Sequence, residues 1–282
     1  MRSFELAQGF DGQRSRLTGV AFRMLGSLSE AEDAVQETWL RLQRADAESV
    51  ENLDGWLTTV ISRICLNMLR GRRRHDPLDP AGEPIVSLDT TGDPEHQALL
   101  ADAVGVALQV VLATLSPAQR LAFVLHDMFS VPFEVIAPLV ERSPQATRQL
   151  ASRARRQVHD AAPLADPDPA IQRAAVQAYF AAARQGDIAA LVAVLDPSVI
   201  LRAHGRDGVT ELRGADRVAR GAVAARAWAS TVRPALINGA AGVVAFDGDI
   251  PFAVLAFTVT DGRIVNVDVF NDRDRVQRLI RT

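Results

Sequence analysis

The sequence contains no lysine and only one cysteine, and these scarcities exclude several kinds of site. Arginine supplies all 31 basic residues of the chain. Because Cys65 stands alone, disulfides within the chain and zinc sites built from several thiolates are excluded, and its apolar neighbours predict a core thiol. No stretch approaches eighteen consecutive apolar residues, and no basic leader precedes an apolar run. We therefore expect a cytoplasmic protein with no membrane partner.

The net charge of −3 hides a separation of charges along the chain. Residues 61–75 hold five arginines and no acid, whereas residues 76–95 hold six acids and no base. A protein with local basic patches need not be basic overall, so the composition is compatible with binding to nucleic acid. The length of 282 residues suggests about two domains.

A basic helix is predicted between residues 143 and 158. Ser143 can cap the free N–H groups of its first turn, and Pro144 suits the first helical position. An apolar residue at every fourth position predicts a narrow buried stripe. This stripe consists of Ala146, Leu150, Ala154 and Val158. The other faces carry groups that can bond to base edges and phosphates. These candidate DNA-contacting residues are Ser143, Gln145, Arg148, Gln149, Ser152, Arg153, Arg155 and Arg156.

The segment before this helix completes a helix-turn-helix pattern. Residues 133–140 predict a short apolar helix, and residues 141–143 form a tight connection. Pro138 should remove a backbone hydrogen bond and bend the first helix. Glu141 stands where such turns often have glycine, which permits a positive φ. The alternative interpretation is a basic helix whose charges are simply solvated.

The first 75 residues predict helices throughout. The first helix ends at Gly26, and Ser29 with Glu32 matches a capping box for the second. Acidic residues in a first turn favour the positive helix end, but Gln36 and Glu37 lie beyond that turn and are candidates for a partner surface. A third helix, capped by Asn52 or Asp54, is predicted from about residue 56 to 70 and ends in a cluster of arginines.

Two acidic, proline-containing segments divide the chain into its predicted domains. The predicted parts are residues 1–75, a linker at 76–95, residues 96–160, a second linker at 161–169, and residues 170–282. In the last part the pattern changes, with helices predicted at 170–185, 187–195, 214–228 and 274–280. Strands are predicted at 199–203, 235–238, 242–246, 253–258 and 263–270. This predicts an α+β domain in which helices pack on a curved antiparallel sheet.

Several segments together resemble one family. Residues 31–39 (AEDAVQETW) resemble the region 2 helix of extracytoplasmic-function sigma factors, and residues 55–74 are similar to the next helix of that region. Residues 115–158 resemble region 4 of the same family. Residues 170–282 resemble the SnoaL-like, nuclear-transport-factor-like cone, which one subgroup of these sigma factors carries at the C-terminus. The resemblance implies two all-α sigma domains followed by an α+β domain, and a function in directing RNA polymerase to promoters.

The resemblance also implies residue roles. The residues that would dock on the clamp of core RNA polymerase are Asp33, Gln36 and Glu37. The residues that would hold the separated strand of the −10 promoter element are Trp56, Arg63, Asn67, Arg70, Arg72, Arg73 and Arg74. Arginine follows phosphates and a flat aromatic side chain can stack on an unpaired base, although Trp56 is equally compatible with a core position. The basic helix at residues 143–156 would read the −35 element.

The third domain is expected to regulate the first two. Segments that help regulation in the fused subgroup correspond here to residues 204–208 and 272–276, which gives His204, Arg206, Asp207, Asp274 and Arg275 as candidates. Some SnoaL relatives transfer protons with a pocket carboxylate or histidine, a role for which Asp268 and His204 are the candidates. Sensing of an unidentified small ligand and plain packing are the alternatives. We expect this domain to contact the linker at 76–95 and region 2.

The expected protein is therefore not an enzyme and needs no cofactor or metal. Two other functions fit the same residues: a helix-turn-helix regulator that works without polymerase, and a SnoaL-like enzyme with a DNA-binding appendage. Reversing the charges of Asp33 and Glu37 would distinguish the first alternative, and turnover of a small molecule would distinguish the second.

Overall fold

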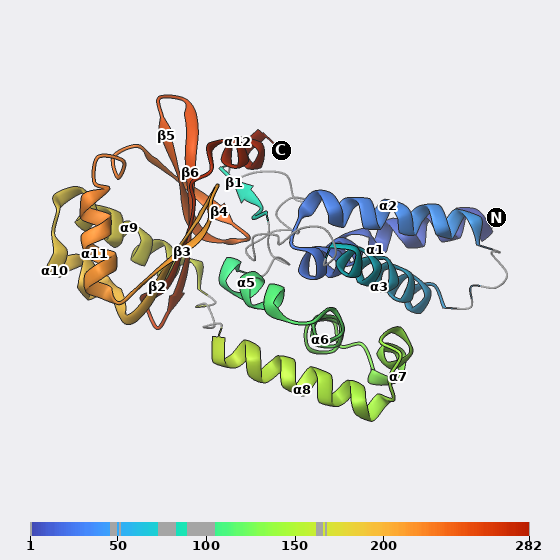
Figure 1. Ribbon diagram of the computed structural model, residues 1–282. Coiled ribbons are helices and arrows are strands. Elements are labelled where there is room, and N and C mark those ends of the chain that lie inside the picture. Colours follow the sequence, from blue (N-terminus) through green and yellow to red (C-terminus); the bar gives the residue numbers. More distant parts are fainter. Residues whose placement is uncertain are drawn as a thin grey trace. The chain divides into compact units, whose positions relative to one another are not determined.

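The chain forms two compact units in a computed structural model, which describes residues 2–45, 50, 52–72, 83–88, 105–161, 166 and 168–281 (Figure 1). One unit comprises Met1–Glu83 and Gln109–Ala161, and the other comprises Pro84–Leu108 and Ala162–Thr282. Arg73, Arg74 and most of the predicted linker at 76–95 lie outside the described residues. None of the helices in these described ranges is long and apolar enough to cross a membrane.

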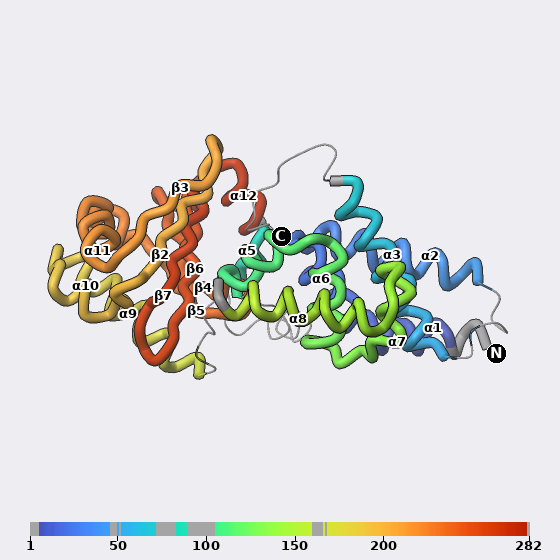
Figure 2. Tube along the Cα trace, turned by 60° about the horizontal axis from the view of Figure 1, so that its bottom comes forward, coloured from blue at the N-terminus to red at the C-terminus, as the bar shows by residue number. Residues whose placement is uncertain are grey.

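The first unit is helical. The elements of this half are α1 (Arg2–Leu25), α2 (Leu28–Arg44), α3 (Leu53–Arg72), α5 (Val106–Thr114), α6 (Pro117–Phe123), the π-helical turn η1 (Val124–Met128), α7 (Phe133–Ile136), the 3-10 turn η2 (Ala137–Leu139) and α8 (Pro144–Ala161). Helices α1, α2 and α3 pack on one another, while α6 packs against α3 and lies alongside α8 (Figure 2). The two predicted helical regions therefore share one compact unit.

The capping residues of α2 and α3 can be compared with those predicted from the sequence. Gly26 adopts a positive φ of 77°, as a chain reversal after α1 requires. The cap of α2 is Ser27, whose Oγ accepts from the Glu30 N–H at 3.5 Å, so the predicted capping box at Ser29 was wrong: that residue already lies inside the helix. For α3 the cap is Asn52, whose Oδ1 accepts from the Gly55 N–H at 3.1 Å.

A buried arginine joins the two helical regions within this unit. Arg120 of α6 is only 5% exposed. Its Nη1 donates to the Met24 carbonyl at the end of α1, and its Nε donates to the Leu112 carbonyl at the end of α5, both at 2.6 Å. Two carbonyls near helix ends thus receive a charged donor, and that of Leu112 also accepts from the Leu115 N–H at 3.2 Å. Nearby, the Arg23 guanidinium lies 4.8 Å from the centre of the Phe129 ring.

The second unit combines helices with one seven-stranded sheet. The helices in the C-terminal part of the chain are α9 (Pro169–Gln185), α10 (Ile188–Val194), α11 (Ala215–Ala224) and α12 (Arg273–Arg281). Its strands are β1 (Val86–Ser87), β2 (Leu195–Gly205), β3 (Gly208–Arg213), β4 (Val232–Ile237), β5 (Ala240–Asp247), β6 (Ile250–Thr260) and β7 (Arg263–Phe270). Their order across the sheet is β1-β4-β5-β6-β7-β2-β3. Strands β1 and β3 were not predicted.

The predicted α+β domain is confirmed, but its sheet is mixed rather than antiparallel, because one strand pair is parallel. Strand β2 pairs in parallel with β7, whereas the other neighbours are antiparallel. A parallel pair needs a long connection, and here it consists of β3, α11 and three further strands. Helices α9, α10 and α11 cover one face (Figure 1), where the rings of Tyr179, Phe180 and Phe257 pack edge to face with centroids 5.2–5.9 Å apart. Because side chains alternate along a strand, Asp268 and Phe270 of β7 lie on the opposite face.

Candidate nucleic-acid interface

Helix α8 begins where the sequence predicted but is rotated relative to the predicted stripe. Its fully buried side chains are Thr147, Ala151 and Ala154. Ala146 and Leu150, which were predicted to be core residues, are only half-buried. Ala154 is buried as predicted, but in the first two turns the side that packs on α6 and α7 carries Thr147 and Ala151, one residue beyond the predicted positions. The threonine is accommodated because its Oγ1 donates to the Ser143 carbonyl at 2.9 Å.

The turn before α8 has the geometry that its sequence demands. Pro138 lies in η2, where the α-helix gives way to a 3-10 turn, as expected where a proline removes a backbone donor. Glu141 adopts a positive φ of 55°, the conformation for which glycine is usual at this turn. Ser143 caps α8, since its Oγ accepts from the Ala146 N–H at 3.2 Å. The segment is a helix-turn-helix.

Two arginines on one flank of α8 are paired with acids of preceding elements. Nη2 of Arg148 lies 3.0 Å from Oε1 of Glu134, a residue of α7. Nε of Arg155 donates to Oδ1 of Asp127, in the π-helical turn, at 2.8 Å. Neither acid was predicted from the sequence, because the charges of α8 alone give no sign of partners on other elements. Their position 14 and 28 residues away shows no local periodicity.

The outward face of α8 is free of such pairs. Its side chains are exposed and make no hydrogen bond or ion pair within the part of the chain that the structure describes. These residues are Gln145, Gln149, Ser152, Arg153 and Arg156. Amide and guanidinium groups on the exposed face of the second helix of a helix-turn-helix are suited to hydrogen bonds in the major groove.

Helix α3 presents a second basic face. Arg63, Asn67 and Arg70 are exposed at i, i+4 and i+7 spacing, so they lie on one side of the helix. Trp56 is half-buried and therefore neither a full core residue nor a free aromatic surface. Arg72 ends the same helix. Cys65 is fully buried on the inner side, and its burial raises the thiol pKa to about 12.

The predicted polymerase-docking residues share the outer side of α2. Asp33 and Gln36 are exposed, while Glu37 is half-buried and its Oε1 accepts from Nε of Arg41 at 2.8 Å. An i, i+4 pair of this kind on a surface helix contributes a few tenths of a kcal/mol. Of the two carboxylates, Asp33 therefore offers the less compensated negative charge.

The predicted regulatory residues lie at the end of β2 and the start of α12. Nη2 of Arg206 is 3.9 Å from Oδ2 of Asp274, with both side chains largely exposed. The Arg275 guanidinium lies 4.9 Å from the centre of the Phe270 ring. Asp207 is exposed in the β2–β3 turn. The two segments that the sequence singled out, 70 residues apart, are thus neighbours.

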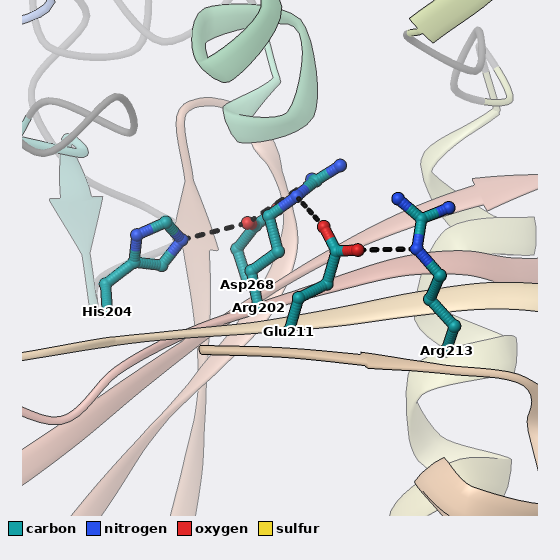
Figure 3. Close-up of polar contacts among 5 residues, drawn as sticks. All are labelled: Arg202, His204, Glu211, Arg213 and Asp268. Carbon is teal, nitrogen blue, oxygen red and sulfur yellow. Dashed lines mark hydrogen bonds and ion pairs between the residues drawn. The ribbon is translucent and has the colours of Figure 1, made fainter. Parts of the chain in front are cut away.

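His204 and Asp268 form a buried pair on the face of the sheet opposite α9–α11 (Figure 3). Nε2 of His204 lies 3.0 Å from Oδ1 of Asp268, and the imidazole stacks on the Phe270 ring with centroids 4.7 Å apart. Nη1 of Arg202 is 3.7 Å from the same carboxylate, and its Nε is 3.6 Å from Glu211. His204 is therefore a residue of β2 with no exposed surface.

One piece of the predicted acidic linker belongs to the sheet. Val86 and Ser87 pair with Ile237 and Leu236 of the β4 edge. The adjoining Ile85 N–H donates to the Oδ1 of Asn238 at 2.7 Å, and the Asn238 N–H donates to the Ile85 carbonyl at 2.8 Å. The proline-rich composition concealed this strand, because its partner lies about 150 residues further along the chain.

Comparison with known families places both helical regions. Residues 11–75 match the Sigma-70 region 2 family, and residues 105–158 match the Sigma-70, region 4 family. A probable ECF RNA polymerase sigma factor, SigI of Mycobacterium tuberculosis, is 37% identical over 265 residues, which cover 91% of this chain and 89% of that protein. The ECF RNA polymerase sigma factor SigJ of the same species is 38% identical over 277 residues, covering 90% and 88%.

The similarity to SigJ extends to three dimensions. The crystal structure of the Mycobacterium tuberculosis extracytoplasmic function sigma factor SigJ superposes with a TM-score of 0.77 at 33% identity, and covers 95% of this chain and 97% of that one. The match therefore includes the helical regions and the C-terminal α+β unit. The chain belongs to the extracytoplasmic-function family of RNA polymerase sigma factors, the proteins that direct RNA polymerase to promoters.

Proposed function

We propose that the chain grips a promoter through two separate surfaces, with α8 reading the −35 element and α3 holding the unpaired strand of the −10 element. The observation that carries the proposal is the pair of exposed, acid-free faces: Gln149 and Arg153 on α8, and Arg63 and Asn67 on α3. The first combines base-reading groups with a helix-turn-helix, and the second offers charge and amide groups to a single strand.

The domain bounds, the polymerase-docking residues and the cellular location are assigned on the same basis. We assign region 2 to residues 1–75, region 4 to residues 96–160 and the regulatory domain to residues 170–282. Asp33 and Gln36 of α2 would dock on the polymerase clamp, where an exposed carboxylate favours a basic partner surface. Because polymerase and promoter are in the cytoplasm, we place the protein there.

The C-terminal unit would regulate without chemistry of its own. His204 has no exposed surface and is held between Asp268 and Phe270, so a substrate cannot reach its ring in this form. On the other face, the rings of Tyr179 and Phe257 fill the space between helices and sheet. Both observations favour packing and regulation over catalysis or ligand sensing.

The linker strand supplies a physical means of regulation. Strand β1 lies between the sequences of regions 2 and 4, and its pairing with β4 attaches that connection to the C-terminal sheet. When β1 is paired with β4, the linker restricts the distance between the two DNA-binding regions. When β1 is unpaired, the linker allows a wider range of distances. The C-terminal unit would thereby bias the sigma factor between restricted and extended arrangements.

Pull-down with core RNA polymerase, followed by run-off transcription on genomic fragments, tests the proposal. Gln149→Ala with Arg153→Ala should abolish dependence on the −35 element while leaving polymerase binding intact, and Asp33→Arg should do the reverse. For the linker, Asn238→Gly removes the acceptor for Ile85 but tolerates the φ of 49°. Its matched control is Asp261→Gly, at the similar φ of 50° in another turn. Equal transcription by both glycine variants and wild type would refute regulation through the strand.

A further inference from the structure

The flank of α8 carries two arginine–acid pairs that differ in their surroundings. Arg148 stands in the second turn of the helix, near the end that enters the major groove in helix-turn-helix proteins. Arg155 lies seven residues further along, on the same flank. Both are about half exposed, and both meet a carboxylate from outside the helix. The Arg148–Glu134 and Arg155–Asp127 pairs can therefore be compared directly, since both lie on the same helix.

Arg148 is held from two directions. Its Nη2 meets Glu134 at 3.0 Å, while its guanidinium lies 5.6 Å from the centre of the Phe133 ring. That ring in turn stacks on His126, with centroids 3.8 Å apart, and the Nδ1 of His126 lies 3.1 Å from the Val131 carbonyl. A guanidinium fixed by an ion pair and an aromatic plane has lost most of its rotamer freedom before any ligand arrives.

The pair leaves part of the guanidinium available. An arginine side chain has five N–H donors in a planar fork, and Glu134 is within hydrogen-bond distance of only one of its nitrogens. The fork geometry matches the O6 and N7 acceptors of guanine in the major groove. The Arg155 fork differs, because both Nε and Nη2 already donate to Asp127, whose side chain is only 19% exposed.

We propose that Glu134 is a positioning residue that orients Arg148 to read one guanine of the −35 element, whereas Asp127 neutralises Arg155 and withholds it from base reading. The inference rests on the assignment of α8 as the −35 helix. Because exposed ion pairs contribute little to stability, Glu134→Gln should fold like the wild type. Its effect should appear in promoter choice.

The test uses the full chain with core RNA polymerase and a promoter library randomised across the −35 element, with run-off transcripts counted by sequencing. Wild type should prefer guanine at one base pair. Arg148→Ala should reduce that preference roughly 5- to 150-fold, as expected for one lost bidentate base contact. Arg148→Lys, which keeps the charge but not the fork, should lose the preference with smaller loss of total transcription. Glu134→Gln should weaken the preference at the same base pair.

Asp127→Asn is the matched control, because it removes the equivalent carboxylate seven residues along the same flank. It should leave the guanine preference read by Arg148 unchanged, and any preference added by the released Arg155 should fall at a different base pair. The inference is overturned if Glu134→Gln keeps the guanine preference, if it alters all positions equally, or if Arg148→Ala lowers transcription uniformly, as a phosphate contact would. Failure of the underlying assignment is distinguishable: Gln149→Ala and Arg153→Ala would then leave every −35 preference intact.

Discussion

If α8 reads the −35 element and α3 holds the −10 strand, as proposed above, the compact helical unit has to open on the promoter, and Arg120 tests this. The −35 and −10 elements are roughly 25 base pairs apart, which is roughly 85 Å along DNA at 3.4 Å per base pair. A compact unit of about 140 residues has a radius of gyration of about 14 Å. Such a unit cannot contact both elements while α3 remains packed against α6 and α1 against η1.

Replacing Arg120 by methionine should shift this equilibrium towards the open form. The substitution keeps an unbranched apolar chain but removes the donor to the Met24 carbonyl, one of the bonds that join α1 to region 4. A buried hydrogen bond to a charged group contributes about 1.5–3 kcal/mol. Since 1.4 kcal/mol is a factor of ten, the ratio of closed to open forms should fall roughly 10- to 150-fold. The lost Leu112 bond lies within region 4 and adds no cost to the separation itself.

Hydrogen exchange followed by mass spectrometry measures the effect. Amides of Phe22 and Leu25, at the end of α1, should exchange faster in Arg120→Met, while the interior of α2 stays protected. Arg14→Met is the control, because Arg14 is half exposed and its pair with Asp11, at 3.7 Å, is weak. Unchanged exchange at the end of α1 would refute the reasoning, as would exchange that rises equally throughout the unit.

Three further predictions concern buried and exposed groups. At pH 8, Cys65 should react with a neutral thiol reagent only after denaturation; stoichiometric labelling of the native protein would show that the core is open. Burial also raises the pKa of Tyr179 to about 12, from 10.0, and that of Cys65 from 9.0. Both folded-state values lie above the unfolded ones, so this contribution to stability is complete below pH 9 and is lost as the pH rises towards 12. Circular dichroism against pH should show that loss, and Tyr179→Phe should remove the tyrosine part of it. Finally, Arg63→Ala with Asn67→Ala should reduce the permanganate reactivity of promoter thymines without changing −35 dependence, and unaltered reactivity would exclude α3 from strand capture.

Local chemistry was enough to predict the helix-turn-helix. A serine followed by proline predicted the start of α8, and the missing N–H of Pro138 accounts for the loss of α-helical geometry there. The turn was expected to favour a positive φ at residue 141, but the glutamate at that position did not by itself predict that it would adopt one. Such features depend on a few neighbouring residues, which is why they can be read without knowing the rest of the fold.

Long-range packing decided the features that the sequence did not reveal. The buried side of α8 includes Thr147, a polar residue whose hydroxyl finds a carbonyl within its own helix. Strand β3 exposes almost all its side chains and therefore lacks the alternation by which strands are predicted. Strand β1 has only two residues and exists because β4 offers an edge. In each case the deciding partner lies on another element.

Partners on other elements also determine what the arginines of α8 can do. Four arginines on α8 suggest a uniform affinity for phosphate when they are counted along the helix. The fold gives two of them carboxylates from α7 and the π-helical turn, and leaves Arg153 and Arg156 without such partners within the described residues. Unpaired arginines add affinity for any DNA, and with it a steeper dependence on salt, whereas an oriented arginine can discriminate between bases. Specificity in this protein should therefore depend on acids that lie outside the recognition helix, because they determine which of its positive charges are free to follow the backbone and which are not.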